Sequence, residues 1–342
     1  MRDAIPVLRH SAAERGKPAQ KTRRITLLWQ QIVVSVMVSA TTRIQAMTLP
    51  SALRFGTCLG ALGYRLAKKK RQIAERNLLL AFGGEKTAGE CERIVRGVFA
   101  HFGRSAVAFL RAPMLSPQAL SAQVTIEGGE YLEAARADGK GIIVTTGHIG
   151  NWEILGRWLA QVEKTPVTVV AKDPKGAVLA GYLRQMRENA GFAVLSKGES
   201  ARPLLRVLQR GEAIIILPDQ NSGDVFVPFF GVPTGTVAGP ASLALHTGAA
   251  LLPVFCLENP DGSYRVICKP PVVAVPTGDR EADVKRIMSE FNFILETVIR
   301  QNVDQWLWLH NRWKSSLEEK NRTRAWGGDE AARDAALARQ KS

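Results

Sequence analysis

The stretch Gly141-Ile-Ile-Val-Thr-Thr-Gly-His-Ile-Gly-Asn-Trp-Glu153 decides the fold of this chain. Its apolar beginning, Gly141–Val144, predicts a buried strand, and Ile149–Val162 predicts a helix. His148 then lies at the carboxyl end of a strand, where open α/β sheets bind their ligands. Glu153 follows in the first turns of the helix, close enough to hold the imidazole. A histidine held by a carboxylate suits activation of a hydroxyl, because the carboxylate fixes the tautomer while the other ring nitrogen takes the proton.

Outward from this stretch, strand-like and helix-like segments alternate from about residue 124 to 275. The predicted strands are Val124–Glu127, Gly141–Thr146, Pro166–Ala171, Ala193–Leu195, Ala213–Pro218, Leu251–Leu257 and Tyr264–Lys269. The predicted helices between them are Tyr131–Ala137, Ile149–Val162, Lys175–Ala190, Ala201–Arg210 and Ala238–Thr247. Such alternation predicts an α/β fold with a mainly parallel central sheet flanked by helices.

The N-terminal third has a different character. Residues 1–25 are basic and polar and predict a disordered tail. Residues 26–66 hold two imperfect apolar segments, Leu27–Thr42 and Leu49–Leu66, and the first is shorter than the roughly 20 residues of a spanning helix. These segments favour a helical, interface-lying membrane anchor, although a single span stays possible. We expect helices at Lys69–Phe82, Glu90–Arg111, Arg280–Asn302 and Gln305–Trp313, a folded domain over 67–314 and a flexible charged tail over 315–342.

The net charge of +15 and the sequence pI near 10 imply a polyanionic partner. Two basic blocks, one ahead of Leu27 and one over residues 65–76, flank the apolar segments, which is typical of a polybasic anchor at a membrane surface. The blocks lack interleaved aromatic residues and no nucleic-acid-binding motif is present, so we expect no nucleic-acid partner. The four cysteines have no metal-binding spacing and no second histidine lies near His148, so we expect no metal.

Several ordered motifs carry a resemblance. The run His148-x-x-x-x-Glu153 resembles the His-x4-Asp/Glu signature of glycerolipid acyltransferases, and its surroundings resemble the lipid A biosynthesis acyltransferases, the lauroyl and myristoyl transferases. Four further stretches match that family in order. They are Arg65–Phe82, Leu217–Gln220 with Val225–Gly231, Thr247–Val254 and Gln305–Lys314. The resemblance spans roughly residues 27–314.

The resemblance implies transfer of a fatty acyl chain from an acyl-carrier-protein or acyl-CoA thioester to a hydroxyl of a lipid A precursor, at the cytoplasmic face of the inner membrane, without a cofactor. His148 would be the general base and Glu153 would orient it. Candidate substrate-binding residues are Asn151, Arg184, Arg187, Asp219, Gln220 and Pro253. Asp219 and Gln220 follow a predicted strand, so they are expected at the same rim of the sheet as His148, in acceptor binding or in support of the dyad.

Three alternatives stay open on the sequence. The acceptor is another glycolipid, such as a phosphatidylinositol mannoside, or a lysophospholipid. The chain is a non-catalytic basic protein that binds lipid. The same histidine activates water, which would make the chain a hydrolase. The tryptophans of the last motif and His310 are expected in packing, and His101 and His246 are expected to be structural.

Overall fold

The computed structural model describes residues 35–171, 176–196 and 201–317. The chain divides into two compact units, 1–43 and 44–342. Of the first unit, residues 35–43 are described and they are helical. The predicted tail over 1–25, the first part of the apolar segment Leu27–Thr42 and residues 318–342 of the predicted C-terminal tail lie outside the described residues.

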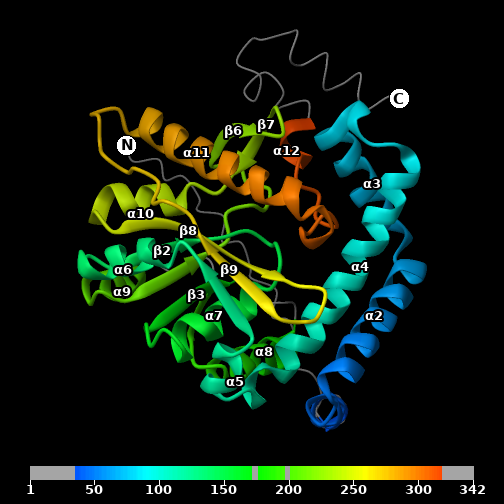
Figure 1. Cartoon of the computed structure of the whole chain (residues 1–342). Coiled ribbons are helices and arrows are strands. Elements are labelled where there is room, and N and C mark those ends of the chain that lie inside the picture. Colours follow the sequence, from blue (N-terminus) through cyan, green and yellow to red (C-terminus); the bar gives the residue numbers. More distant parts are fainter. Residues whose placement is uncertain (1–34, 172–175, 197–200, 318–342) are drawn as a thin grey trace, which may run out of the picture. The chain divides into compact units, whose positions relative to one another are not determined.

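A seven-stranded sheet forms the centre of the second unit, in the order β1-β9-β8-β2-β5-β3-β4 (Figure 1). Its strands are β1 (Val124–Glu127), β2 (Ile142–Thr145), β3 (Val167–Ala171), β4 (Ala193–Ser196), β5 (Ala213–Ile216), β8 (Ala250–Glu258) and β9 (Tyr264–Cys268). The five strands from β8 to β4 are parallel, whereas β9 is antiparallel to β8 and parallel to β1. The predicted α/β fold with a mainly parallel sheet is confirmed, and all seven predicted strands are present.

Two apolar clusters cover the two faces of this sheet. Consecutive side chains of β2 point to opposite faces, so Ile143 joins one cluster while Ile142 and Val144 join the other. The helices beside the sheet include α6 (Gly129–Ala137), α7 (Trp152–Gln161), α8 (Ala177–Asn189), α9 (Arg202–Gln209), α10 (Gly239–Thr247) and α11 (Arg280–Gln301). Side chains of α6 and α7 enter one cluster, and side chains of α9, α10 and α11 enter the other. Both faces are therefore closed and the rim at the carboxyl ends of the parallel strands is left for a site.

Helix α2 (Leu49–Leu66) packs along α4 (Ala88–Arg111) at the right of Figure 1, and α3 (Lys68–Phe82) follows α2. The approach of α2 to α4 depends on glycine. A Cβ on Gly60 would lie 2.2 Å from the carbonyl oxygen of Phe99, and one on Gly103 would lie 2.1 Å from the carbonyl oxygen of Gly56. No helix in the described part of the chain is long and apolar enough to cross a membrane.

One local prediction is wrong, and one pair of strands was not predicted. The predicted helix Gln305–Trp313 is a single 3-10 turn, Val303–Gln305, followed by irregular backbone. The three indoles of this segment are buried, and those of Trp306 and Trp308 donate to Asp219 and to the carbonyl oxygen of Val303, so tertiary packing overrides the helical pattern. A hairpin of β6 (Val225–Phe229) and β7 (Val232–Thr236) was not predicted. Its two-residue turn, Phe230-Gly231, has positive φ at both positions, as a type I′ turn requires.

Candidate active site

The parallel pairing of β2 with β5 creates the candidate site. His148 lies in the loop that leaves β2, and Asp219 and Gln220 lie in the loop that leaves β5. Because neighbouring parallel strands end at the same edge, the two loops meet there. The imidazole Nδ1 of His148 is 2.7 Å from Oδ1 of Asp219. The prediction that Asp219 shares the rim with His148 is confirmed.

Asp219 is almost completely buried and its carboxylate accepts three hydrogen bonds. Oδ1 faces Nδ1 of His148, and Oδ2 accepts from the backbone N–H of His148 at 2.7 Å and from the indole Nε1–H of Trp306 at 2.9 Å. Burial alone would raise the pKa of this carboxyl, but the charge and hydrogen bonds of His148, together with Trp306, lower the pKa to about 2. Asp219 is therefore an anion at neutral pH, and it holds the histidine by its backbone and its ring.

The ring orientation directs Nε2 of His148 away from Asp219. With Nδ1–H donated to Asp219, Nε2 carries a lone pair and lies 3.2 Å from the side-chain nitrogen of Gln220. The His148 ring packs against Trp152, with ring centroids 5.0 Å apart, and the His148 side chain is 19% exposed. A carboxylate-held imidazole whose second nitrogen carries a lone pair can remove a proton from a bound hydroxyl.

Glu153 has a different partner from the one expected. Its carboxylate accepts from Arg187, with Nη2 2.6 Å from Oε1 and Nε 3.1 Å from Oε2. Both side chains are more than four-fifths buried. In this structure Asp219, rather than Glu153, occupies the orienting position on His148, because the turn into α7 directs Glu153 toward α8.

The structure also separates the two arginines of α8. Arg187 pairs with Glu153, whereas Arg184 donates to the carbonyl oxygen of Val194 and to the hydroxyl of Ser196, at the end of β4. Arg187 therefore lies next to the helix that follows His148. The predicted substrate contacts of both arginines stay predictions.

Two other candidates have structural contacts. The side-chain oxygen of Asn151 accepts from the backbone N–H of Ile154 at 3.1 Å, which caps α7, and Asn151 is almost completely buried. Pro253 is buried in β8 beside Thr145, and its carbonyl oxygen accepts from Lys269. Any contact of Asn151 or Pro253 with a substrate stays a prediction.

The sequence interpretation missed the polar role of the last motif. Trp306 was expected only to pack, yet its indole binds Asp219. His310 accepts from the backbone N–H of Asn221 through Nε2, and burial lowers its pKa to about 4, so it is neutral. Arg312 is fully buried and donates to the carbonyl oxygen of Gly235 and the hydroxyl of Thr236. The sequence signal for this role was Arg312 itself, which stands among three tryptophans that were expected to be buried. A guanidinium buried with them must find hydrogen-bond acceptors.

No three His, Cys, Asp or Glu side chains converge on a metal-binding position within the described residues. The buried carboxylate of Asp219 and the oriented imidazole of His148 are groups that could support general base catalysis.

The chain is similar to bacterial acyltransferases. Residues 18–315 match the family model described as bacterial lipid A biosynthesis acyltransferase. The phosphatidylinositol mannoside acyltransferase of Mycobacterium tuberculosis (strain H37Rv) is 33% identical over 230 residues, which are 65% of this chain and 70% of that protein. The lipid A biosynthesis palmitoleoyltransferase of Escherichia coli K12 is 27% identical over 265 residues, 76% of this chain and 84% of the relative. The lauroyltransferase of the same organism is 27% identical over 274 residues, 79% and 87% of the two chains.

Proposed function

Because the chain belongs to the bacterial lipid A biosynthesis acyltransferase family, whose curated relatives are acyltransferases, we propose that it moves a fatty acyl chain from a thioester to a hydroxyl of a glycolipid. The observation that carries this proposal is the contact of 2.7 Å between the buried Asp219 carboxylate and Nδ1 of His148. It leaves Nε2 as a base at a rim where a substrate can approach.

In the proposed reaction Nε2 of His148 accepts the proton of the acceptor hydroxyl as its oxygen attacks the thioester carbonyl. The C–S bond then breaks, the imidazolium returns the proton to the leaving sulfur, and the products are an ester and a thiol. Asp219 stabilises the imidazolium while it exists. No acyl-enzyme is needed, because the thioester is already an activated donor.

The oxyanion of the tetrahedral intermediate requires donors. Backbone N–H groups at the start of α7 and the guanidinium of Arg187 are the proposed ones. The ion pair with Glu153 supports this role, because it holds Arg187 next to the first turn of α7. In this proposal Glu153 acts on the site through Arg187.

The proposed donor is an acyl carrier protein or coenzyme A thioester, and the proposed acceptor is a lipid A precursor. Both donors and the acceptor are anionic, and the net charge of +15 would draw them to this chain. A phosphatidylinositol mannoside or another glycolipid is a second candidate acceptor. The specific observation in its favour is the 33% identity to the mycobacterial relative, against 27% for the two Escherichia coli relatives.

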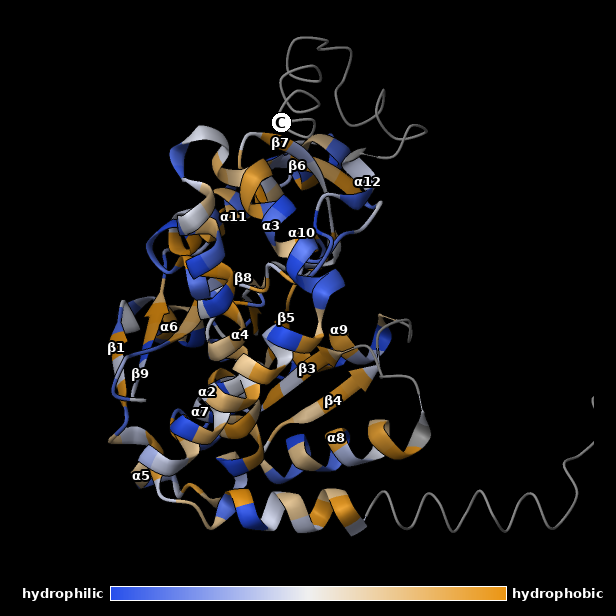
Figure 2. Cartoon of the chain, turned by 90° about the vertical axis from the view of Figure 1, so that its right-hand side faces the viewer, coloured by the Kyte–Doolittle hydropathy of each residue, from blue (hydrophilic) through white to orange (hydrophobic). Residues whose placement is uncertain are grey.

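Membrane attachment is part of the proposal, at the cytoplasmic face of the inner membrane. On α2 the side chains of Phe55, Leu59, Leu62 and Leu66 recur at helical spacing and are 41%, 44%, 50% and 75% exposed. Basic residues accompany this apolar stripe, namely Arg54 and Arg65 on α2 and Lys68, Lys69 and Lys70 on α3. Helix α2 faces the viewer in Figure 2 and carries both kinds of residue. An exposed apolar stripe beside cationic side chains suits an anionic lipid surface.

Mass spectrometry of acyl transfer tests the reaction. The protein and its His148→Ala variant are offered acyl-carrier-protein and acyl-CoA donors with a lipid A precursor, a phosphatidylinositol mannoside or a lysophospholipid. We expect a mass gain of one acyl chain on one glycolipid, lost in the variant. Release of free fatty acid without an acylated lipid would support a hydrolase, and equal transfer by His148→Ala would contradict the proposal.

Vesicle flotation tests the membrane surface separately. A Leu59→Gln, Leu62→Gln double variant should float with anionic vesicles much less than the parent, and the parent should release as salt rises. Thr57→Gln, a solvent-exposed substitution on the same helix outside the apolar stripe, is the matched control. Unchanged flotation of the double variant would exclude the stripe as the contact.

A further inference from the structure

The loop that carries His148 is fixed to the protein by its backbone. The carbonyl oxygen of His148 accepts from Leu307 at 2.9 Å, and the N–H of Gly150 donates to the carbonyl oxygen of Gln305 at 3.0 Å. Gly150 has a φ of +59°, and a Cβ there would lie 2.0 Å from the carbonyl oxygen of Cys256. The backbone conformation two residues after the base is therefore tightly constrained.

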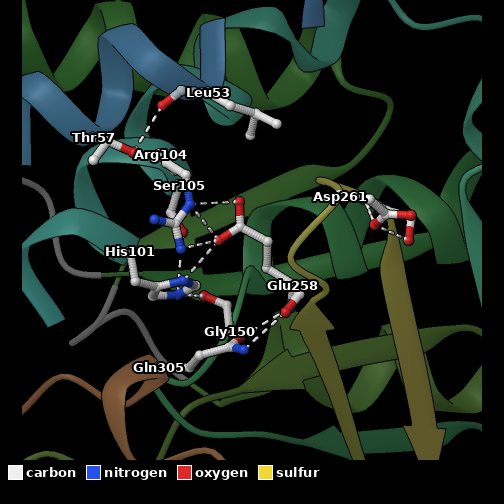
Figure 3. A network of polar contacts seen from close by, with 10 residues as sticks. Leu53, Thr57, His101, Arg104, Ser105, Gly150, Glu258, Asp261 and Gln305 are labelled. Atoms are coloured by element: carbon white, nitrogen blue, oxygen red, sulfur yellow. Dashed lines mark hydrogen bonds and ion pairs between the residues drawn. The ribbon is translucent and has the colours of Figure 1, made fainter. Parts of the chain in front are cut away.

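The remaining contact of Gly150 comes from a distant histidine. His101 on α4 is completely buried, and its Nε2 is 3.0 Å from the carbonyl oxygen of Gly150 (Figure 3). Its other nitrogen, Nδ1, is 3.0 Å from Oε2 of Glu258 on β8. Glu258 in turn accepts from Nε of Arg104 at 3.1 Å and 3.0 Å. A chain of polar contacts thus runs from α4 and β8 to the loop of the base.

The charge state of His101 follows from its two partners. A carbonyl oxygen and a carboxylate both accept, so each ring nitrogen must donate, and only the imidazolium carries two N–H groups. Ser105, whose hydroxyl is 3.3 Å from Nε2, adapts to either state. Burial would raise the pKa of Glu258, but the hydrogen bonds and charges of His101 and Arg104 lower it, so Glu258 is an anion.

Two other titratable neighbours of Glu258, Cys256 and Tyr264, are neutral. Burial raises the pKa of Cys256 on β8 and of Tyr264 on β9 far above neutrality, and the charge of Glu258 adds to both shifts. Glu258 is therefore a buried anion between two cations, the buried His101 and the partly exposed Arg104. Burying a charged ring costs free energy, and an apolar side chain would fill the same space without that cost. The hydrogen bond of the imidazolium to the carbonyl oxygen of Gly150 therefore suggests a role beyond packing.

We propose that His101 is a positioning residue for catalysis, whose imidazolium, held by Glu258, the ion-pair partner of Arg104, fixes the carbonyl of Gly150 and thereby the direction of the His148 ring. The inference rests on the proposed function, because it concerns the same base. His101 touches no reacting atom. It acts through the backbone of the β2–α7 loop, where a displacement of about 1 Å at the base costs on the order of 100-fold in rate.

Two matched variants separate positioning from packing. In His101→Gln the amide nitrogen takes the place of Nε2 and can donate to Gly150. In His101→Asn the amide nitrogen takes the place of Nδ1 and reaches Glu258 only. We expect His101→Asn to lower kcat about 10- to 100-fold with an unchanged KM for the donor, and His101→Gln to restore most of that loss. Equal kcat in the two variants, at equal folded fraction, would overturn the proposal.

A double-variant cycle distinguishes this inference from the proposed function. In a His148→Ala background, His101→Asn should lower the residual rate no further, because the base that it positions is gone. An equal loss in both backgrounds would assign His101 to general stability and leave the proposed function standing. Full activity of His148→Ala alone would instead remove the proposed function, whatever His101 does.

The protonation state of His101 can be measured by ¹⁵N NMR on a chain that keeps His101, so this test does not depend on the folding of a His101 variant. The chain has five histidines, so ring ¹⁵N resonances can be assigned by substituting the other four one at a time. We expect both ring nitrogens of His101 to be protonated at neutral pH. A neutral His101 ring would overturn the proposal.

Discussion

Replacing Asp219 by asparagine changes the state of the base without changing its surroundings. Oδ2 of Asp219 accepts from two fixed donors, the backbone N–H of His148 and the indole of Trp306, whereas Oδ1 faces only the imidazole. The amide oxygen of an asparagine is best placed at the Oδ2 position, where it accepts from both of these donors. Its amide nitrogen then points at Nδ1 of His148 and donates to it, so the ring proton moves to Nε2. The nitrogen that should accept the hydroxyl proton has lost its lone pair.

The size of the effect can be worked from the same contacts. The pKa of Asp219 is lowered from 3.8 to about 2. This difference corresponds to roughly 2 kcal/mol of stabilisation of the ionised carboxylate by its surroundings, or a factor on the order of 30 in an equilibrium or rate constant. The wrong tautomer adds to this loss, and removal of a general base costs about 10²- to 10⁴-fold. We therefore expect Asp219→Asn to lower kcat by about 10³-fold and to leave KM for the acyl donor nearly unchanged.

Steady-state acyl transfer, followed by the mass of the acylated lipid, checks this value. Glu153→Gln is the matched control, because it neutralises the other carboxylate near the base while its amide oxygen can still accept from Arg187. We expect Glu153→Gln to retain at least tenfold more activity than Asp219→Asn. The reverse order would return the orienting role to Glu153, and wild-type kcat in Asp219→Asn would refute the dyad.

Three further predictions concern stability, each read from thermal unfolding. Gly60→Val should destabilise the chain by more than about 3 kcal/mol, because its Cβ would lie 2.2 Å from the carbonyl oxygen of Phe99; an unchanged melting temperature would show that α2 is not seated on α4. At the start of α4, the side-chain hydroxyl of Thr87 accepts from the N–H of Glu90 at 3.3 Å, and the Glu90 carboxylate accepts from the N–H of Thr87 at 2.8 Å. Thr87→Ala removes this capping box and should lower the free energy of unfolding by about 1 kcal/mol. The lowered pKa of Asp219 adds about 2 kcal/mol to the free energy of unfolding above pH 4, and this contribution is lost as the pH falls toward 2. The free energy of unfolding should therefore fall less between pH 4 and pH 2 in Asp219→Asn than in the wild type. An identical fall in the two proteins would contradict the ionised carboxylate.

The sheet was predictable because its strands are short apolar runs separated by amphipathic helices. Val124–Glu127 was predicted with its observed bounds, and the other strands differ from their predicted bounds by no more than two residues at an end. The hairpin of β6 and β7 was missed because Pro228 and Pro233 interrupt its strands. Its turn, Phe230-Gly231, also lacks the Asn-Gly or Asp-Gly pair that usually marks such hairpins.

The position of His148 at the rim of the sheet was predictable, and the carboxylate that contacts its ring was not. Closeness in sequence favoured Glu153, but the register of β2 with β5 decides which carboxylate meets His148, and that register is a long-range property. The contact of Trp306 with Asp219 likewise joins residues 87 positions apart. Local patterns carry no information on such pairs, so the sequence could place Asp219 at the correct rim without deciding between acceptor binding and support of the dyad.

The ratio of single-turnover rates between the wild type and His148→Ala, measured across pH, tests the central claim most directly. If neutral His148 is the general base, the ratio is large at neutral and alkaline pH and falls about tenfold for each pH unit once the ring is protonated. The account predicts this fall, with one acyl chain gained by the lipid in every active sample. A ratio near one at all pH values would contradict it.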